Sequence, residues 1–227
     1  MGVFCTSDLH GNYAIWNEMN KFLKPEDTLF VLGDCADRGP RGWDIIKEVI
    51  RRPNTIYLKG NHEDMLYKAV KEWNEVGDDF TWFRPALDLL FANGGEDTWY
   101  DLIYNEDDPM AWGRYINNLG FFEKYVNPDG VKIIMTHAGY TPSNTRRLPN
   151  IQDLLWDRNH ITDAWEENDS ADVIIHGHTP SVYIDEKAEV GALYYCDDHK
   201  ICLDNATYST NAAVLLNLDT FDEEIFM

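Results

Sequence analysis

The stretch Gly33-Asp34-Cys35-Ala36-Asp37-Arg38-Gly39 tells most about how this chain folds. It follows the apolar run 28–32, which is typical of a buried strand ended by glycine. Two carboxylates and an arginine therefore follow the carboxyl end of a strand, which is where ligands bind in open α/β sheets. Taken alone, the stretch is equally compatible with an ordinary turn, because Gly and Asp both favour turns.

Four other strand-like runs are also followed at once by polar side chains. These are residues 3–6 with Asp8 and His10, residues 55–58 with Asn61 and His62, residues 131–136 with His137, and residues 172–175 with His178. Apolar residues recur at helical spacing over 15–23 and 41–51, between the first runs. This alternation predicts βαβ units and a largely parallel sheet in the first half of the chain.

Residues 64–127 break the alternation. The segment is helix-rich and holds four of the eight tryptophans, which are Trp73, Trp82, Trp99 and Trp112. We expect a helical insertion in which these rings form a small core, and the alternative is that some of them line a cap over the site. Beyond it, the runs 192–195 and 213–216 predict hairpins that form a second sheet. Without repeats or a linker, residues 1–227 are expected to form a single domain.

Composition excludes several classes of function. The chain has 19 basic and 40 acidic residues and a net charge of −21, and so acidic a surface repels nucleic acid and anionic membranes. An anionic substrate would need bound cations to reverse the local charge. No long apolar run or basic leader is present, so we expect a cytoplasmic protein. The cysteines Cys5, Cys35, Cys196 and Cys202 are expected to be reduced, with a Cys196–Cys202 bridge as the alternative.

Six of the side chains that follow strands are nitrogen or oxygen donors. They are Asp8, His10, Asp34, Asn61, His137 and His178. A set without thiolate suits divalent cations of the Mn, Fe or Zn type rather than a structural zinc. Asp34 could bridge two ions, since a carboxylate has two oxygens. Two ions about 3.5–4 Å apart clamp the attacking and leaving oxygens of an in-line displacement and lower the pKa of bound water to about 7.

The clusters DLHG, GDCADRG, GNHE, HAG and GHTP occur in this order. On these motifs the chain resembles the phosphoprotein phosphatase branch of the calcineurin-like metallophosphoesterases, in particular the bacteriophage lambda type of serine/threonine protein phosphatase. The resemblance covers about residues 3–217 and is weakest over 64–127. It implies an α/β fold, a metallophosphoesterase-type β-sandwich of two mixed sheets flanked by helices, with 64–127 as a helical insertion.

The resemblance also implies roles for individual residues. The first metal would be held by Asp8, His10 and Asp34, and the second by Asp34, Asn61, His137 and His178. His62 would be the general acid that protonates the leaving alkoxide, a contribution of about 10²–10⁴ in rate, and Asp37 would orient it. Arg38 and Arg158 would bind the phosphoryl oxygens. For Arg158 a surface salt bridge is the alternative.

The last motif departs from the GHxH pattern of many other metallophosphoesterases. Pro180 stands where those have a second metal-binding histidine, which fits the protein phosphatase branch. His176 is an extra histidine two residues before His178, and we interpret it as structural.

The implied activity is that of a metal-dependent phosphomonoesterase of the serine/threonine protein phosphatase type. A hydroxide held by two ions, with manganese expected and iron or zinc possible, would attack phosphorus. The alternative is a symmetrical dinucleoside-tetraphosphate hydrolase, which shares these motifs. A catalytically inactive binding module would keep the fold but lose ligands, and all of the ligands are present. The expected partner is therefore a phosphorylated protein or a small phosphoester, with neither nucleic acid nor a membrane involved.

Overall fold

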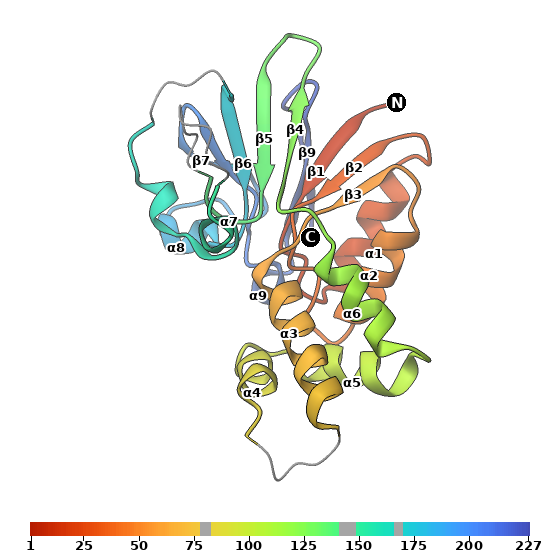
Figure 1. Cartoon of the computed structure of the whole chain (residues 1–227). Coiled ribbons are helices and arrows are strands. Elements are labelled where there is room, and N and C mark those ends of the chain that lie inside the picture. Colours follow the sequence, from red (N-terminus) through yellow and green to blue (C-terminus); the bar gives the residue numbers. More distant parts are fainter. Residues whose placement is uncertain (78–82, 141–148, 166–169) are drawn as a thin grey trace.

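In the computed structural model, which describes residues 1–77, 83–140, 149–165 and 170–227, ten strands form two mixed sheets of five strands each (Figure 1). The first sheet has the order β10-β9-β1-β2-β3, with β1 (Val3–Thr6), β2 (Thr28–Val31), β3 (Thr55–Tyr57), β9 (Ala213–Asn217) and β10 (Glu223–Phe226). The second has the order β4-β5-β6-β8-β7, with β4 (Phe122–Val126), β5 (Lys132–Thr136), β6 (Val173–His176), β7 (Tyr194–Asp197) and β8 (Lys200–Cys202). The predicted two-sheet α/β fold is confirmed.

The parallel strands carry the polar clusters to one end of the molecule. Strands β1, β2 and β3 are parallel to one another, as are β5, β6 and β8. In Figure 1 the loops that follow these strands meet beneath the sheets, above α3 (Asn61–Val76). The clusters are therefore brought together by the strand ends of two sheets, β1, β2 and β3 of the first and β5 and β6 of the second.

The C-terminal hairpins do not form a sheet of their own, so that prediction is wrong. The β7–β8 hairpin extends the second sheet beside β6, whereas β9 lies antiparallel to β1 and brings β10 into the first sheet. The first four residues of β9, 213–216, are all buried. A strand that is apolar on both faces is stable only where both faces are covered, which requires a central place in a sheet.

Alternate side chains of the first sheet serve two cores. Cys5, Phe30 and Leu216 pack against residues of the second sheet and fill the space between the sheets. Leu29 and Leu215 point the other way, toward the helices. This period-two alternation is what a strand buried on both faces requires.

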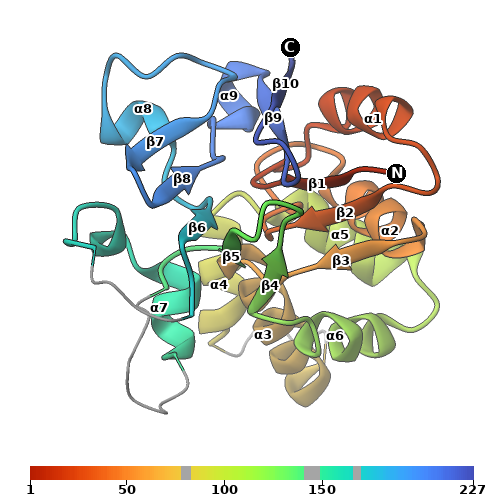
Figure 2. The ribbon, with the colours of Figure 1, turned by 90° about the horizontal axis from the view of Figure 1, so that it is seen from above.

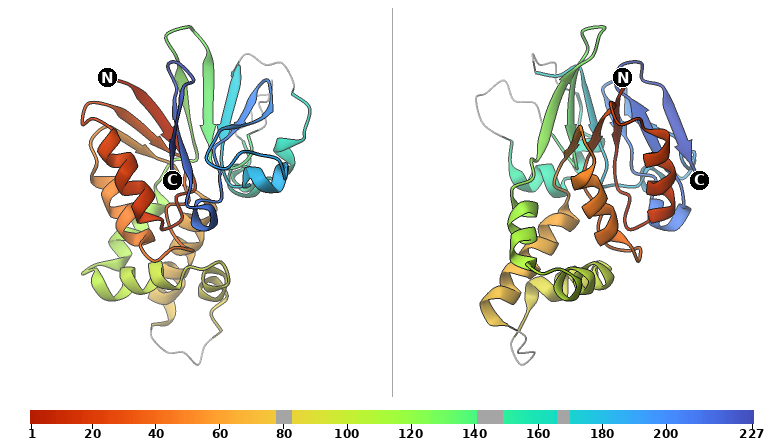
Figure 3. Two further views of the ribbon diagram at one scale, coloured as in Figure 1. Left: turned by 180° about the vertical axis from the view of Figure 1, so that it is seen from behind. Right: turned by 90° about the vertical axis from the view of Figure 1, so that its right-hand side faces the viewer.

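The helices cover the outer faces and the lower end of the sandwich. They are α1 (Tyr13–Phe22), α2 (Gly42–Arg51), α3, α4 (Pro85–Ala92), α5 (Glu96–Asn105), α6 (Pro109–Asn117), α7 (Ile151–Trp156), α8 (Ser181–Ile184) and α9 (Thr207–Thr210), with a 3-10 turn at Asn159–Ile161. Figures 2 and 3 show α1 and α2 against the outer face of the first sheet, and α3 to α6 gathered below both sheets. No helix in the described ranges is both long and apolar enough to cross a membrane.

The helical segment 64–127 shares its core with the rest of the first layer. Trp99 is buried, and the Trp112 ring packs edge-on against Trp43 of α2 with centroids 5.1 Å apart. The buried side chains of α3 to α6 thus belong to one cluster with those of α1 and α2, and Trp73 and Trp112 pack against it. Trp82 lies outside the described residues.

All four cysteines are free thiols. In the β7–β8 hairpin Cys202 pairs with Tyr194, and the register shifts between Tyr195 and Asp197. Cys196 is therefore not placed opposite Cys202, and the alternative of a bridge between them is not realised.

Candidate metal centre

Backbone hydrogen bonds join the two loops that carry the first candidate ligands. The N–H of Asp8 donates to the carbonyl of Gly33 over 3.2 Å, and the N–H of His10 donates to that of Asp34 over 2.9 Å. These bonds continue the parallel pairing of β1 and β2 beyond the strand ends. Asp8, His10 and Asp34 are therefore held together by the sheet itself.

The first group of donors surrounds the Nε2 atom of His10. This atom lies 3.8 Å from Asp8 Oδ1 and 3.6 Å from Asp34 Oδ2. The other ring nitrogen, Nδ1, is 3.0 Å from the carbonyl oxygen of Ala36. A backbone carbonyl on one nitrogen fixes the tautomer and turns the other toward a metal, as is usual for metal-binding histidines.

The second group lies on the other side of Asp34. The Nε2 atom of His137 is 3.5 Å from Asp34 Oδ2 and 2.8 Å from Asn61 Oδ1, and His178 Nδ1 is 3.0 Å from the same amide oxygen. His137 Nδ1 is bound to the carbonyl of Leu32 over 2.9 Å. Asp34 thus takes part in both groups, as a bridging carboxylate would.

These residues fit metal ions by their chemistry and by two buried atoms without a hydrogen-bond partner among the described residues, Asp8 Oδ1 and His178 Nε2. Asp8 Oδ1 is buried and has no hydrogen-bond partner among the described residues, and a buried acceptor without a partner indicates a missing donor or cation. Metal–ligand bonds of about 2.0–2.2 Å place two ligands of one ion about 3–3.5 Å apart, close to the separations observed. Among the described residues, two groups have donor atoms close enough together to hold a metal ion: His10, Asp34 and His62, and Asp34, His137 and His178. Asp8 Oδ1 lies 3.8 Å from His10 Nε2 and borders the first of these groups.

Burial sets the protonation of this site. Desolvation, helped by the charges of Glu63 and Asp8, raises the pKa of Asp34 well above its usual value. Desolvation also lowers the pKa of His10 well below its usual value and the pKa of His178 to about 2. The imidazoles are therefore neutral, which is the form that binds metals, and the buried carboxylate needs a cation to be charged.

Several of these residues have a left-handed backbone that sequence patterns do not reveal. The φ angle is +54° at Asp8, +43° at His10, +53° at Asp34 and +67° at His178. Such conformations cost about 1–3 kcal/mol each in residues other than glycine and gather at functional sites. In this site, these backbone conformations turn the side chains of the strand-end loops toward a common point.

His62 and Asp37 form a buried pair beside the first group. His62 Nδ1 is 2.7 Å from Asp37 Oδ2, and its Nε2 atom is 3.8 Å from Asp34 Oδ2. Burial acts to lower the pKa of His62, but the charges of Asp34 and Asp37 and the hydrogen bond to Asp37 outweigh it, so the pKa is raised. A buried carboxylate therefore orients this imidazole and favours its protonated form.

The two arginines lie at the rim of the site. Arg38 is exposed, and one of its guanidinium nitrogens is 3.1 Å from His62 Nε2. Arg158 is also exposed and donates to Thr179 Oγ1 over 2.8 Å and to the carbonyl of His178 over 3.3 Å. Arg158 therefore lies next to a candidate ligand, and no ion pair appears for it among the described residues.

His176 stays apart from both groups. It is buried, its Nδ1 atom is 3.1 Å from the carbonyl of Gly177, and its Nε2 atom is 3.7 Å from Cys196 Sγ. Burial lowers its pKa to about 4. This environment agrees with the structural interpretation.

Glu63 is a residue of the site that sequence reasoning left without a role. Its fully buried carboxylate accepts hydrogen bonds from the backbone N–H groups of Asp34 and Gly60, from those of Cys35 and Ala36, and from the Tyr57 hydroxyl. It thereby holds the loop that begins with Asp34. The signal was its place in the GNHE cluster, at the third residue of α3, where a glutamate can bind back to preceding backbone.

Two further residues fix Asp8. The Ser7 hydroxyl donates to Asp8 Oδ2, and the backbone N–H of His178 donates to the same oxygen over 3.0 Å. A Cβ atom at Gly177 would lie 1.9 Å from this oxygen, so only glycine fits there. No local pattern marks Ser7, because its contact is set by the turn after β1.

A family model described as calcineurin-like phosphoesterase matches residues 1–182. Serine/threonine-protein phosphatase 2 of Escherichia coli (strain K12) is 27% identical over 186 residues, which are 78% of each chain. The symmetrical bis(5'-nucleosyl)-tetraphosphatase of Acidovorax ebreus (strain TPSY) is 25% identical over 64% of this chain, and the chain spans only 46% of that protein.

Two solved structures have a similar fold. One is described as a putative diadenosine tetraphosphatase, with a TM-score of 0.62, 17% identity and coverage of 99% of this chain and 92% of the other. The other is a protein serine/threonine phosphatase from Saccharomyces cerevisiae with similarity to human phosphatase PP5, with a TM-score of 0.63, 14% identity and coverage of 100% and 79%. At these identities the likeness concerns the fold alone.

Proposed function

This chain belongs to the calcineurin-like phosphoesterase family, and from that premise we propose that it removes phosphate from phosphoserine or phosphothreonine in proteins. The observation that carries the proposal is the pair of donor groups that share Asp34, the first of which also contains His62, the partner of Asp37. The similarity to serine/threonine-protein phosphatase 2 over most of both chains supports this substrate class. The four free thiols support a reducing, cytoplasmic location.

Two divalent cations are the proposed cofactors, with manganese first and iron or zinc as alternatives. One would be held by Asp8, His10 and Asp34, and the other by Asp34, Asn61, His137 and His178. When bound, such ions supply an activated water and offset the charge of the phosphoryl oxygens. The donor chemistry, nitrogen and oxygen without thiolate, supports this set of metals.

His62 is the proposed general acid. As the bond between phosphorus and the leaving oxygen breaks, the Nε2 proton of His62 passes to that oxygen, and the phosphoryl group gains the oxygen of a water molecule. Asp37, 2.7 Å from Nδ1, stabilises the charged imidazolium before the transfer. Proton donation matters because an alkoxide is a poor leaving group.

Arg38 must change partner for this step. In the structure its guanidinium is 3.1 Å from His62 Nε2, the atom that would carry the transferable proton. A phosphoryl group offers this exposed side chain a stronger, bidentate partner. Substrate binding would thus draw Arg38 onto the phosphoryl oxygens, together with Arg158, and leave Nε2 to the leaving group.

A symmetrical dinucleoside-tetraphosphate hydrolase is the second candidate. It is favoured by the curated tetraphosphatases among the similar proteins. The residues that handle the phosphoryl group do not separate the two substrate classes, since they do not contact the leaving group's organic part.

The test is a side-by-side assay of the purified protein. Metal-free protein should be inactive, and added Mn²⁺ should restore phosphate release from phosphoserine and phosphothreonine peptides. Faster turnover of diadenosine tetraphosphate than of any phosphopeptide would move the conclusion to the second candidate. If the metal-bound protein released no phosphate from any peptide, aryl phosphate or dinucleotide, both candidate functions would be refuted.

A further inference from the structure

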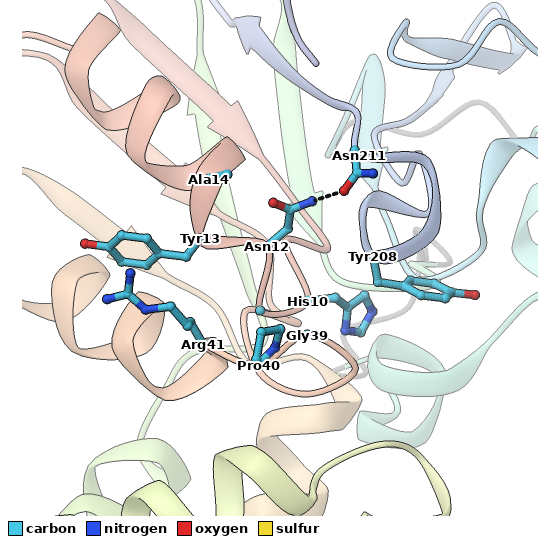
Figure 4. Close-up of a pocket in the computed structure, with 10 residues that line it drawn as sticks. His10, Asn12, Tyr13, Ala14, Gly39, Pro40, Arg41, Tyr208 and Asn211 are labelled. Atoms are coloured by element: carbon cyan, nitrogen blue, oxygen red, sulfur yellow. Dashed lines mark hydrogen bonds between the residues drawn. The ribbon is translucent and has the colours of Figure 1, made fainter.

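A pocket of about 420 Å³ lies directly beside His10 (Figure 4). It is lined by residues of three separate parts of the chain, which are His10, Gly11, Asn12, Tyr13, Ala14, Gly39, Pro40, Arg41, Tyr208 and Asn211. Its volume is in the range of small-molecule sites, which is about 300–1,000 Å³. None of the roles proposed above uses this pocket, although His10 is both a proposed metal ligand and part of the pocket lining.

One wall is a planar stack that is already in place. The Arg41 guanidinium lies over the Tyr13 ring, 3.4 Å from its centroid. Arg41 Nε donates to Asp44 over 2.7 Å, and the Tyr13 hydroxyl donates to Glu48. Both side chains are therefore anchored at their far ends, and a flat surface is presented without further loss of side-chain freedom.

The opposite wall is Tyr208 of α9. Asn12 fixes this short helix by donating to the carbonyl of Thr207 over 3.2 Å and to the Asn211 amide oxygen over 3.1 Å, the bond drawn in Figure 4. Asn211 itself has a φ of +53°, which lets it close the helix and reach Asn12. The two walls thus come from opposite ends of the sequence and are tied together.

Tyr208 also contacts the reacting centre. Its ring lies 4.8 Å from the Arg38 guanidinium carbon and meets the His10 ring edge-on, with centroids 5.8 Å apart. The His10 ring in turn is 4.7 Å from that of His62, the proposed acid. Tyr208 therefore connects the pocket to Arg38 and His10, beside the proposed acid His62.

The floor of the pocket is backbone and cannot shift easily. A Cβ atom at Gly11, where φ is +67°, would lie 2.3 Å from the carbonyl oxygen of Gly39. The two metal-binding loops are therefore in direct contact, and the depth of the pocket is fixed. A group held here has a defined position relative to His10.

We propose that this pocket, whose lining includes Tyr208 and the Tyr13–Arg41 stack, binds a planar ring carried by the leaving group of the substrate. Aromatic rings and guanidinium planes are the usual stacking partners of flat π systems. The ring could be a nucleobase or an aromatic side chain next to a phosphorylated serine. The inference rests on the proposed phosphoesterase function and names the substrate chemistry of the same site.

The test compares substrates with and without a ring in wild type, Tyr208→Ala and Arg41→Ala. The substrates are diadenosine tetraphosphate, a phosphoserine peptide with a flanking tyrosine, the same peptide with alanine, and glycerol phosphate. Stacking losses of the usual size predict a rise of about five- to hundredfold in KM for a ring-bearing substrate. In Arg41→Ala the KM of glycerol phosphate should change less than about twofold. In Tyr208→Ala, whose ring also packs against Arg38, the rise in KM should be larger for the ring-bearing substrate than for glycerol phosphate. Arg41 is exposed, so its removal does not threaten folding.

Two controls separate stacking from other effects. Tyr208→Phe keeps the ring and should keep the wild-type KM. Tyr195→Ala removes a tyrosine of β7 that is more exposed than Tyr208 and does not line the pocket, and it should change nothing. Whichever ring-bearing substrate shows the selective loss identifies the source of the ring. Equal KM values for substrates with and without a ring, in wild type and in both pocket variants, would overturn the inference.

A binding arm keeps the inference separate from the proposed function. Saturation-transfer NMR with adenosine and with tyrosinamide on the full chain should show contact with one of them that Tyr208→Ala abolishes. This readout requires no turnover. If no phosphoester is hydrolysed and ring binding persists, the proposed function fails alone, and if hydrolysis occurs and neither ring binds, the inference fails alone.

Discussion

Replacing Glu63 by glutamine should lower the free energy of unfolding more than any other isosteric change in the site, because this carboxylate holds the loop that carries Asp34. The carboxylate is fully buried, and every contact it makes is with a donor. Its Oε2 atom accepts from the N–H groups of Asp34 and Gly60 over 2.7 and 2.9 Å. Its Oε1 atom accepts from those of Cys35 and Ala36 over 3.0 and 3.4 Å, and from the Tyr57 hydroxyl over 2.6 Å.

The magnitude follows from counting donors. A glutamine in the same place must turn its NH₂ group toward one of these two sets, and the Tyr57 hydroxyl can rotate to accept from it. Two backbone N–H groups then lose their acceptor in either orientation. A buried unsatisfied group costs about 1–3 kcal/mol, so the loss is about 2–6 kcal/mol. Removal of a buried charge offsets part of it, which leaves about 2–4 kcal/mol, a large share of a typical folding free energy of 5–15 kcal/mol.

Urea denaturation followed by circular dichroism measures this loss as a lower midpoint at unchanged slope. The matched control is Glu75→Gln, an exposed glutamate on the same helix α3, which should stay within about 0.5 kcal/mol of wild type. A Glu63→Gln protein as stable as this control would refute the view that the carboxylate holds the loop.

Three other changes test the metal centre and the core. Asp34→Asn should lower the metal content at both positions, measured by elemental analysis after dialysis; loss of only one ion would contradict the bridging role. His62→Asn should keep its metals and lose about 10²–10⁴ in rate on phosphoserine peptides, and an equal loss on an activated aryl phosphate would count against proton donation. Gly11→Ala, with its Cβ forced to within 2.3 Å of the Gly39 carbonyl, should lower the thermal midpoint, and an unchanged midpoint would show that the two loops can separate. The fourth test is pH: burial lowers the pKa of His160 to about 2, so the unfolded state, with a pKa of about 6.5, binds the extra proton below that pH. His160 should therefore contribute a fall in stability of about 1.4 kcal/mol per pH unit below 6.5, or about 2 kcal/mol at pH 5, in addition to the contributions of His176 and His178; His160→Leu should reduce the slope by this amount, and an identical slope would exclude His160 as a source.

The candidate ligands could be read from the sequence because each is local to a strand end. An apolar run followed by a carboxylate or imidazole marks both the strand and the edge to which its side chains belong, and parallel strands bring such edges together. Asp34 and His137 illustrate this, since they are about a hundred residues apart and yet their oxygen and nitrogen atoms lie 3.5 Å apart. Because β2 and β5 belong to different sheets, this meeting depends on the packing of the two sheets as well as on the parallel order within each.

The position of β9 in the first sheet could not be predicted from the sequence, because it depends on a distant segment. Its apolar residues predict a buried strand but do not indicate which strand it pairs with, and that strand is β1 at the other end of the chain. The left-handed backbone at Asp8 and His10 was equally hidden, because it is imposed by contacts with the loop after β2.

By itself, then, the sequence determined which side chains could bind metal and on which strands they stand, since both are properties of short segments. Only the tertiary structure decided what surrounds them. Glu63 became a loop support, and Asn12 became a link to Asn211, 199 residues away. Such roles depend on which distant segments pack together, and that is settled by the burial of the whole chain rather than by any stretch of it.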